Sequence, residues 1–208
     1  MKVLAVGAHP DDIELGCAGT LAAHVANGDE VTMLVMTDGK SGPGDVAQRV
    51  YEQEKAAEHL GAHLVWGGVP DGVVGNYEQM TLQVVEEALK SSGATRLYTH
   101  SAEDSHQDHR AVAGLSFGAA RNLREVLCYD SPSSRGFEAN LYIDITRFLN
   151  CKLAALNCHE SQVLASNRVE MEFVKAQAMY RGGLVRVGAA EGFCVERMLL
   201  SVNGQTQT

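Results

Sequence analysis

The sequence is short of the features that mark several specialised classes of protein. Its cysteines number five, an odd count with no CxxC pair, which argues against a disulfide framework and a thiolate zinc site. Acidic residues outnumber basic ones by 26 to 17, and the net charge of −9 disfavours a nucleic acid or an anionic membrane as a partner. No apolar run reaches the roughly 20 residues of a membrane-spanning helix. The first apolar run soon meets the polar segment HPDD, so we expect no signal peptide and a cytoplasmic location.

What is present describes an ordinary globular domain. Hydrophobic residues make up 45% and charged residues 21% of the chain, and no repeat or low-complexity linker divides it, so we expect one domain over 1–208. Short apolar runs predict strands at 2–8, 30–37, 63–66, 96–100, 125–130, 141–145 and 193–201. Segments of helical spacing between them predict helices at 15–27, 46–60, 77–91, 109–120, 146–157 and 168–180. This alternation predicts an α/β fold, a Rossmann-like three-layer sandwich with a mostly parallel sheet flanked by helices.

Two of the loops that follow predicted strands carry His and Asp at short spacing. Parallel sheets bind ligands beyond the carboxyl ends of their strands, which directs attention to the loops at 8–14, 38–49, 67–76 and 100–109. HPDD follows the first strand and HQDH the fourth. His9, Asp12 and His109 would give zinc two imidazoles and one carboxylate, with a position left for water. We therefore predict a metal site on these three residues, although iron(II), cobalt or nickel would also suit it.

Three neighbours of these ligands are expected to serve the chemistry. Asp11 points away from Asp12 in an extended turn and would accept a proton from metal-activated water. His106, as an imidazolium, would stabilise the oxyanion of a tetrahedral intermediate, and Asp108 would orient His106 by accepting its other ring N–H. Taken alone, HPDD is equally well interpreted as a helix N-cap and HQDH as a solvated loop. Their joint position at two strand ends favours the metal site.

These residues resemble the LmbE/PIG-L family of zinc-dependent N-deacetylases. AHPDD near the N-terminus and HxDH about a hundred residues later carry the resemblance. It continues through nearly the whole chain, in Thr37-Asp38-Gly39, the R..E...AA..LG pattern of 49–61, Pro70-Asp71-Gly72, the DIT…K..AL..H.SQ pattern of 144–162 and Glu191-Gly192-Phe193. The resemblance implies the same metal ligands, base and oxyanion residue as above. It adds Arg49 and Asp71 as residues that hold sugar hydroxyls. For Arg49, a surface salt bridge with Glu52 or Glu54 is an equally good interpretation.

The resemblance implies hydrolysis of the N-acetyl group of an N-acetylglucosamine-type or related amino-sugar conjugate. An amidase of thiol or amino-sugar conjugates and a deacetylase of an antibiotic intermediate stay open as alternatives. A nucleotide-binding Rossmann protein is disfavoured, because the first strand leads into GAHPDD and not into GxGxxG. The chain has Ala189 where family members often carry a tyrosine near the oxyanion, so Tyr180 is a candidate substitute. A homo-oligomer, such as a trimer or hexamer, is also implied.

Overall fold

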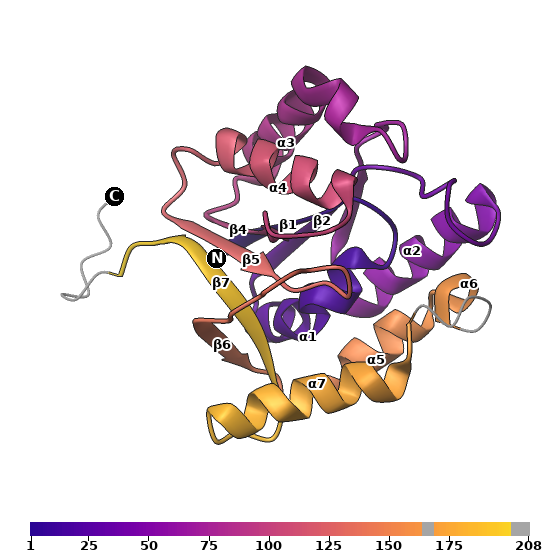
Figure 1. Cartoon of the computed structure of the whole chain (residues 1–208). Helices are drawn as coiled ribbons and strands as arrows, with labels where there is room; N and C mark the ends of the chain where they lie inside the picture. Colours follow the sequence, from indigo (N-terminus) through magenta and orange to yellow (C-terminus); the bar gives the residue numbers. More distant parts are fainter. Residues whose placement is uncertain (164–168, 201–208) are drawn as a thin grey trace.

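A seven-stranded sheet organises the protein, which the computed structural model describes over residues 1–163 and 169–200 (Figure 1). The strands are β1 (Lys2–Gly7), β2 (Glu30–Val35), β3 (His63–Trp66), β4 (Arg96–His100), β5 (Glu125–Tyr129), β6 (Leu141–Asp144) and β7 (Ala190–Met198). Their order is β3-β2-β1-β4-β5-β7-β6. The first five run parallel, and β7 is antiparallel to both β5 and β6. The expected mostly parallel sheet is confirmed.

Helices cover both faces of this sheet and complete the three layers (Figure 1). They are α1 (Asp12–Ala26), α2 (Val46–Leu60), α3 (Glu78–Ser92), α4 (Gln107–Ala119), α5 (Leu149–Asn157), α6 (Glu160–Val163) and α7 (Met171–Leu184), with a 3₁₀ turn η1 at Val74–Tyr77. Successive residues of β1 point to opposite faces. Val3 and Ala5 belong to the core that includes α1 residues, and Leu4 and Val6 to the core that includes α3 and α4 residues. Among the described residues, no helix is long and apolar enough to cross a membrane.

The predicted elements are all present, and several of their boundaries differ from the prediction by two to four residues. α1 begins at Asp12, three residues early, and α4 at Gln107, two residues early. α5 begins three residues late, because the Asp144 carboxylate accepts hydrogen bonds from the backbone N–H and hydroxyl of Thr146 and holds a turn there. α7 extends four residues beyond its predicted end, and β7 begins three residues early. The predicted helix start at 168 and strand end at 201 lie outside the described residues.

The strand order reverses between β1 and β4, and this reversal positions the site. From β1 the chain moves outward to β2 and β3, and then returns to place β4 on the other side of β1. Open α/β sheets bind ligands at such a reversal, beyond the carboxyl ends of the strands. HPDD directly follows β1, and HQDH begins α4 after β4. The two motifs therefore meet at one edge of the sheet.

Candidate active site

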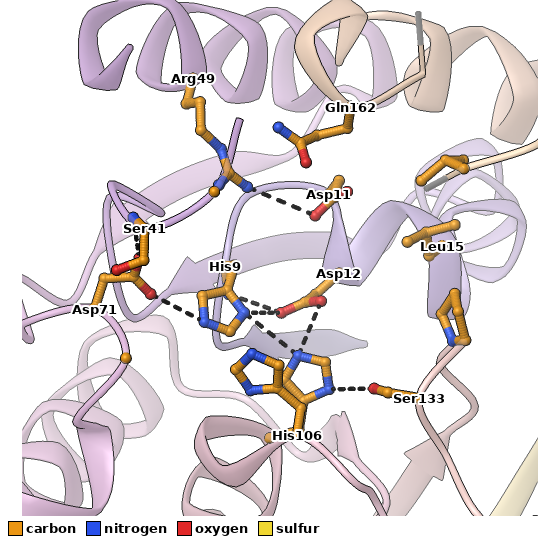
Figure 2. Close-up of a pocket in the computed structure, with 15 residues that line it drawn as sticks. His9, Asp11, Asp12, Leu15, Ser41, Arg49, Asp71, His106, Ser133 and Gln162 are labelled. Atoms are coloured by element: carbon orange, nitrogen blue, oxygen red, sulfur yellow. Dashed lines mark hydrogen bonds and ion pairs between the residues drawn. The ribbon is translucent and has the colours of Figure 1, made fainter. Parts of the chain in front are cut away.

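A pocket of about 340 Å³ opens where β1 and β4 end (Figure 2). All four predicted loops contribute to its wall, and the other lining residues are Leu15, Pro132, Ser133, Gln162 and Val169. The residues that line it are His9, Asp11, Asp12, Leu15, Ser41, Gly42, Arg49, Asp71, Gly72, His106, His109, Pro132, Ser133, Gln162 and Val169. The expectation that the four loops come together is confirmed.

His9, Asp12 and His109 converge on one point of this pocket. The Nδ1 atom of His9 lies 3.2 Å from Oδ2 of Asp12 and 3.3 Å from Nε2 of His109. Nε2 of His109 lies 3.3 Å from Oδ1 of Asp12. In a tetrahedral site with metal–ligand distances of about 2.0–2.1 Å, neighbouring ligand atoms are about 3.3 Å apart. The two ring nitrogens therefore have the spacing of neighbouring ligands in a tetrahedral site, and the Asp12 carboxylate places one oxygen at a similar distance from each of them.

The charges around these donors also favour a cation. Burial lowers the pKa of His109, but the charge of Asp12 and the hydrogen bond with Asp104 outweigh it and raise that pKa to about 9. Burial raises the pKa of Asp12, but the neighbouring His109 and His100 hold it well below its ordinary value. The Asp12 and Asp104 carboxylates thus favour a positive charge at the imidazoles beside them. A divalent cation would satisfy the same attraction and leave the imidazoles neutral.

Asp11 occupies the N-cap position of α1 without acting as a cap. Its φ of 88° lies in the left-handed region, which is uncommon for a residue with a side chain and is found mostly at functional sites. The carboxylate makes no capping hydrogen bond and lines the pocket, while its backbone N–H donates to Oε1 of Gln53. Burial and the charge of Asp12 raise the pKa of Asp11 to about 7. The N-cap interpretation of HPDD is thus wrong for the side chain.

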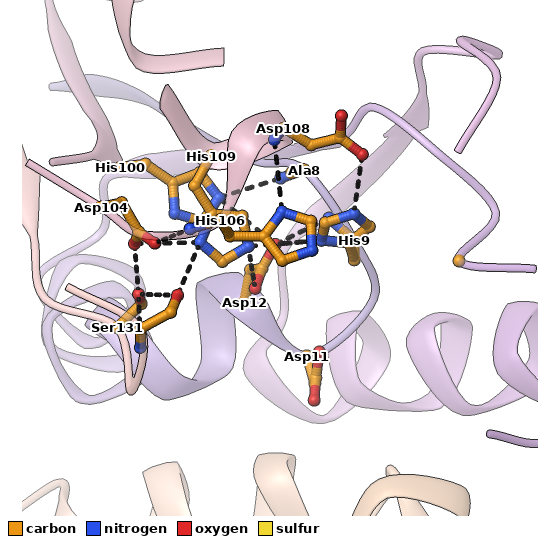
Figure 3. Close-up of polar contacts among 12 residues, drawn as sticks. Ala8, His9, Asp11, Asp12, His100, Asp104, His106, Asp108, His109 and Ser131 are labelled. Atoms are coloured by element: carbon orange, nitrogen blue, oxygen red, sulfur yellow. Dashed lines mark hydrogen bonds and ion pairs between the residues drawn. The ribbon is translucent and has the colours of Figure 1, made fainter. Parts of the chain in front are cut away.

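His106 and Asp108 both lie at the start of α4, but the Asp108 carboxylate does not orient the His106 ring as expected. The Asp108 carboxylate accepts hydrogen bonds from the backbone N–H groups of Gly72 and Val74, and it also lies near His9. Asp108 contacts His106 through its own backbone N–H, which donates to Nδ1 of the His106 ring (Figure 3). Burial and the nearby His109 and His9 lower the pKa of His106, which favours the neutral ring. A neutral ring that accepts at Nδ1 carries its proton on Nε2 and remains a donor.

Arg49 is buried and ties two loops together. Its Nη1 donates to the carbonyl of Gly39 at 2.5 Å and its Nη2 to the carbonyl of Pro10 at 3.0 Å. Nη2 also lies 3.9 Å from the Asp11 carboxylate. A Cβ at Gly39 or Gly42 would come within 2.6 Å of the guanidinium, so the loop after β2 needs glycine to wrap around it. With 4% of its surface exposed, Arg49 makes no surface salt bridge, and that interpretation was wrong.

Two residues that the sequence analysis did not assign, Asp104 and His100, support the predicted ligands. Asp104 is buried, and its Oδ2 lies 3.0 Å from Nδ1 of His109 and accepts from the hydroxyl of Ser131 (Figure 3). His100 accepts a hydrogen bond from the backbone N–H of Ala8 at Nε2, and the same ring nitrogen lies 3.3 Å from Asp12. Burial and the charge of His109 lower its pKa to about 4, so it stays neutral. The loop after β5, which holds Ser131, follows the same strand-end rule and was open to prediction.

Tyr180, the candidate substitute for the tyrosine expected near the oxyanion, does not reach the pocket. The Tyr180 side chain is 69% exposed on α7 and is not among the residues that line the pocket. Ala189 is buried, and its carbonyl accepts the backbone N–H of Ile145. Within one chain, neither position supplies a phenol to the site.

Comparisons with known proteins assign the chain to a family. The family described as PIG-L: GlcNAc-PI de-N-acetylase matches residues 4–120, which include both motifs and more than half of the chain. The chain is similar to the uncharacterized deacetylase YaiS of Escherichia coli (strain K12), with 34% identity over 167 residues, 76% of this chain and 90% of the relative. It is also similar to the diacetylchitobiose deacetylase of Thermococcus kodakarensis, with 26% identity over 186 residues, 77% of this chain and 70% of the relative.

Solved structures share the fold over nearly the whole chain. The conserved protein TT1542 from Thermus thermophilus has a TM-score of 0.87 at 27% identity, covering 100% of both chains. GalB, the 4-carboxy-2-hydroxymuconate hydratase of Pseudomonas putida, has a TM-score of 0.81 over 98% of this chain and 99% of its own. Its 20% identity shows the fold alone, and the fold therefore does not decide the reaction. The family match and the similarity to YaiS decide it. The chain belongs to the PIG-L family and is a deacetylase, a hydrolase of that family.

Proposed function

We propose that this protein removes the acetyl group from the nitrogen of an N-acetylglucosamine-type or related amino sugar, with zinc bound by His9, Asp12 and His109. The observation that carries the proposal is the close approach of the donor atoms of these three residues, 3.2 to 3.3 Å between neighbouring residues, at the edge of a pocket that Asp11 also lines. Two imidazoles and one carboxylate, with a position left for water, are one of the ligand sets of catalytic zinc. Iron(II) or another divalent metal would fit the same donors.

The roles of the surrounding side chains follow from their positions. The cation supplies Lewis acidity and a water of lowered pKa when it is bound. Asp11 is the general base, because its carboxylate faces the pocket and its backbone is held in place through Gln53. His106 donates a hydrogen bond from its Nε2–H to the oxygen of the acyl group as negative charge develops there. Arg49 lies in the pocket wall beside Asp11 and contributes to the contact with the sugar.

The size of the pocket supports a small substrate group. About 340 Å³ is at the lower end of the roughly 300–1,000 Å³ typical of ligand sites, which leaves room for one sugar ring and its acetamide. A relative acts on diacetylchitobiose, as its name states, and we carry that substrate class to this chain as part of the proposal. The homo-oligomer implied by the resemblance stays a prediction, which sedimentation of the purified protein would test.

The experiment measures the free amine and the carboxylic acid that the zinc-loaded protein releases from a panel of amides. The panel contains N-acetylglucosamine, diacetylchitobiose, N-acetylglucosamine linked to a second group, and amides in which the acyl group is larger than acetyl. We expect acetate from at least one N-acetyl amino sugar. Hydrolysis of the larger amides alone would favour the amidase alternative. No hydrolysis across the panel by protein that carries zinc would contradict the proposal.

A further inference from the structure

His9 has polar neighbours at both of its ring nitrogens. Its Nδ1 belongs to the group of donors that would bind the metal. Its Nε2, on the other side of the ring, lies 3.1 Å from Oδ1 of Asp71 and 3.3 Å from Oδ2 of Asp108 (Figures 2 and 3). A neutral imidazole that offers Nδ1 to a metal carries one proton, and that proton is on Nε2. Two carboxylates therefore face one N–H group.

The Asp71 carboxylate is fixed by the loop after β2. Its Oδ2 accepts from the backbone N–H of Ser41 at 2.7 Å, and its Oδ1 lies 3.3 Å from the hydroxyl oxygen of Thr37. The side chain is 3% exposed. Both Asp71 oxygens thus have hydrogen-bond donors within the protein. Oδ1 has two of them, the Thr37 hydroxyl and Nε2 of His9.

The Asp108 carboxylate is fixed by the turn after β3. Its Oδ2 accepts from the backbone N–H of Gly72 at 2.8 Å and its Oδ1 from that of Val74 at 3.0 Å. The side chain is fully buried. Asp108 immediately precedes the predicted ligand His109 on α4, so α4 contributes one ligand and one of the carboxylates that support the other ligand.

We propose that Asp71 and Asp108 are positioning residues that share the Nε2 proton of His9 and so keep its Nδ1 lone pair directed at the metal. This inference rests on the metal site in the proposed function. Carboxylates behind a ligating histidine fix its tautomer and ring orientation, and loss of such a partner costs about 10- to 100-fold in metal affinity. Because two acceptors serve one proton here, either one can take over when the other is lost.

His109 provides a matched comparison within the same site. Its outer nitrogen, Nδ1, has a single carboxylate partner, Asp104, at 3.0 Å, with the hydroxyl oxygen of Ser133 at 3.3 Å. Loss of Asp104 therefore removes the only carboxylate that the described residues place at this nitrogen. We expect Asp104→Ala to weaken zinc binding about 10- to 100-fold as a single change.

The test is a double-mutant cycle on zinc affinity, measured on apo-protein by competition with a chelator. We expect Asp71→Ala and Asp108→Ala each to weaken zinc binding less than about tenfold, and the double variant to weaken it by more than the product of the two single effects. Thermal unfolding of each apo-protein checks that it folds. Where an alanine variant does not, the asparagine variant, which keeps the size and loses the charge, takes its place.

The results separate this inference from the sugar-contact role expected for Asp71 and from the metal site itself. A raised KM for Asp71→Ala, together with a double variant that binds zinc no more weakly than Asp108→Ala alone, would assign Asp71 to the sugar and overturn the inference. A double variant with zinc affinity no weaker than the product of the single effects would overturn the sharing of the proton. A wild-type chain that binds no zinc would overturn the proposed function together with this inference.

Discussion

Nδ1 of His9 and Nε2 of His109 lie 3.3 Å apart, although 100 residues separate them in the sequence. The parallel pairing of β1 with β4 brings the two histidines together, because each follows the carboxyl end of its strand. Two imidazoles at this distance, with the Asp12 carboxylate beside both, would compete for protons without a cation between them. Their spacing is the basis of the function proposed for this chain.

Asp11→Asn is expected to separate chemistry from metal binding. Asparagine tolerates the left-handed backbone that Asp11 adopts, so the turn and the ligands around it stay in place. It cannot accept a proton, and kcat should fall by about 10²- to 10⁴-fold while bound zinc stays at the wild-type level. Turnover and zinc content are measured on the same preparation.

The control for Asp11→Asn is Glu54→Gln, which removes one negative charge from an exposed position on α2. We expect that variant to keep wild-type turnover. Wild-type kcat in Asp11→Asn would show that another residue is the base.

Arg49→Lys is expected to loosen the loop after β2. One ammonium cannot reach the carbonyls of Gly39 and Pro10 together as the planar guanidinium does. Loss of these bonds should lower the free energy of unfolding by about 1–3 kcal/mol and raise KM. Denaturant unfolding and steady-state kinetics measure the two effects. If KM rises while stability is unchanged, Arg49 acts on the sugar directly and not through the loop.

Lys152→Met is expected to destabilise the fold through a buried ion pair. α1 is interrupted at Cys17, whose φ of −148° and ψ of 17° are not helical. The Glu191 carboxylate accepts the N–H groups of Gly19 and Thr20 beyond this break, and Lys152 Nζ lies 2.6 Å from Glu191 Oε1. Removal of the ammonium leaves a buried carboxylate without its counter-charge, which costs about 3–5 kcal/mol.

Urea unfolding measures the effect of Lys152→Met, and Lys175→Met, at an exposed position on α7, is the matched control. The control should stay within about 0.5 kcal/mol of the wild type. Equal stability of the two variants would contradict the structural role given to Lys152.

The parts of the structure that local signals determine could be predicted from the sequence. α2 matches its prediction at both ends, because Asp45 caps its start and Gly61, with a φ of 70°, ends it. The direction of a side chain depends on the tertiary structure and could not be predicted in the same way. Asp108 was expected to face His106, but the backbone N–H groups of Gly72 and Val74 attract its carboxylate to the other side.

Two motif residues at the C-terminal half of the chain illustrate the same limit. The sequence pattern includes Lys152 and Glu191 without indicating a role, because they pair with each other and with backbone groups of α1 on either side of its break. Asp104 is separated from His109 by only five residues, yet its function depends on the turn that brings it back to the ring. Spacing identified the ligands, and the carboxylates that support them became visible only in three dimensions.

The most direct test of this account is the metal content of the purified protein, measured by elemental analysis together with deacetylase activity. We expect about one zinc per chain in the wild type and in His63→Ala, which changes an exposed histidine on β3. We expect neither bound zinc nor activity in His109→Ala. One equivalent of zinc retained by His109→Ala, or full activity of wild-type protein stripped of all divalent metal, would contradict the central claim.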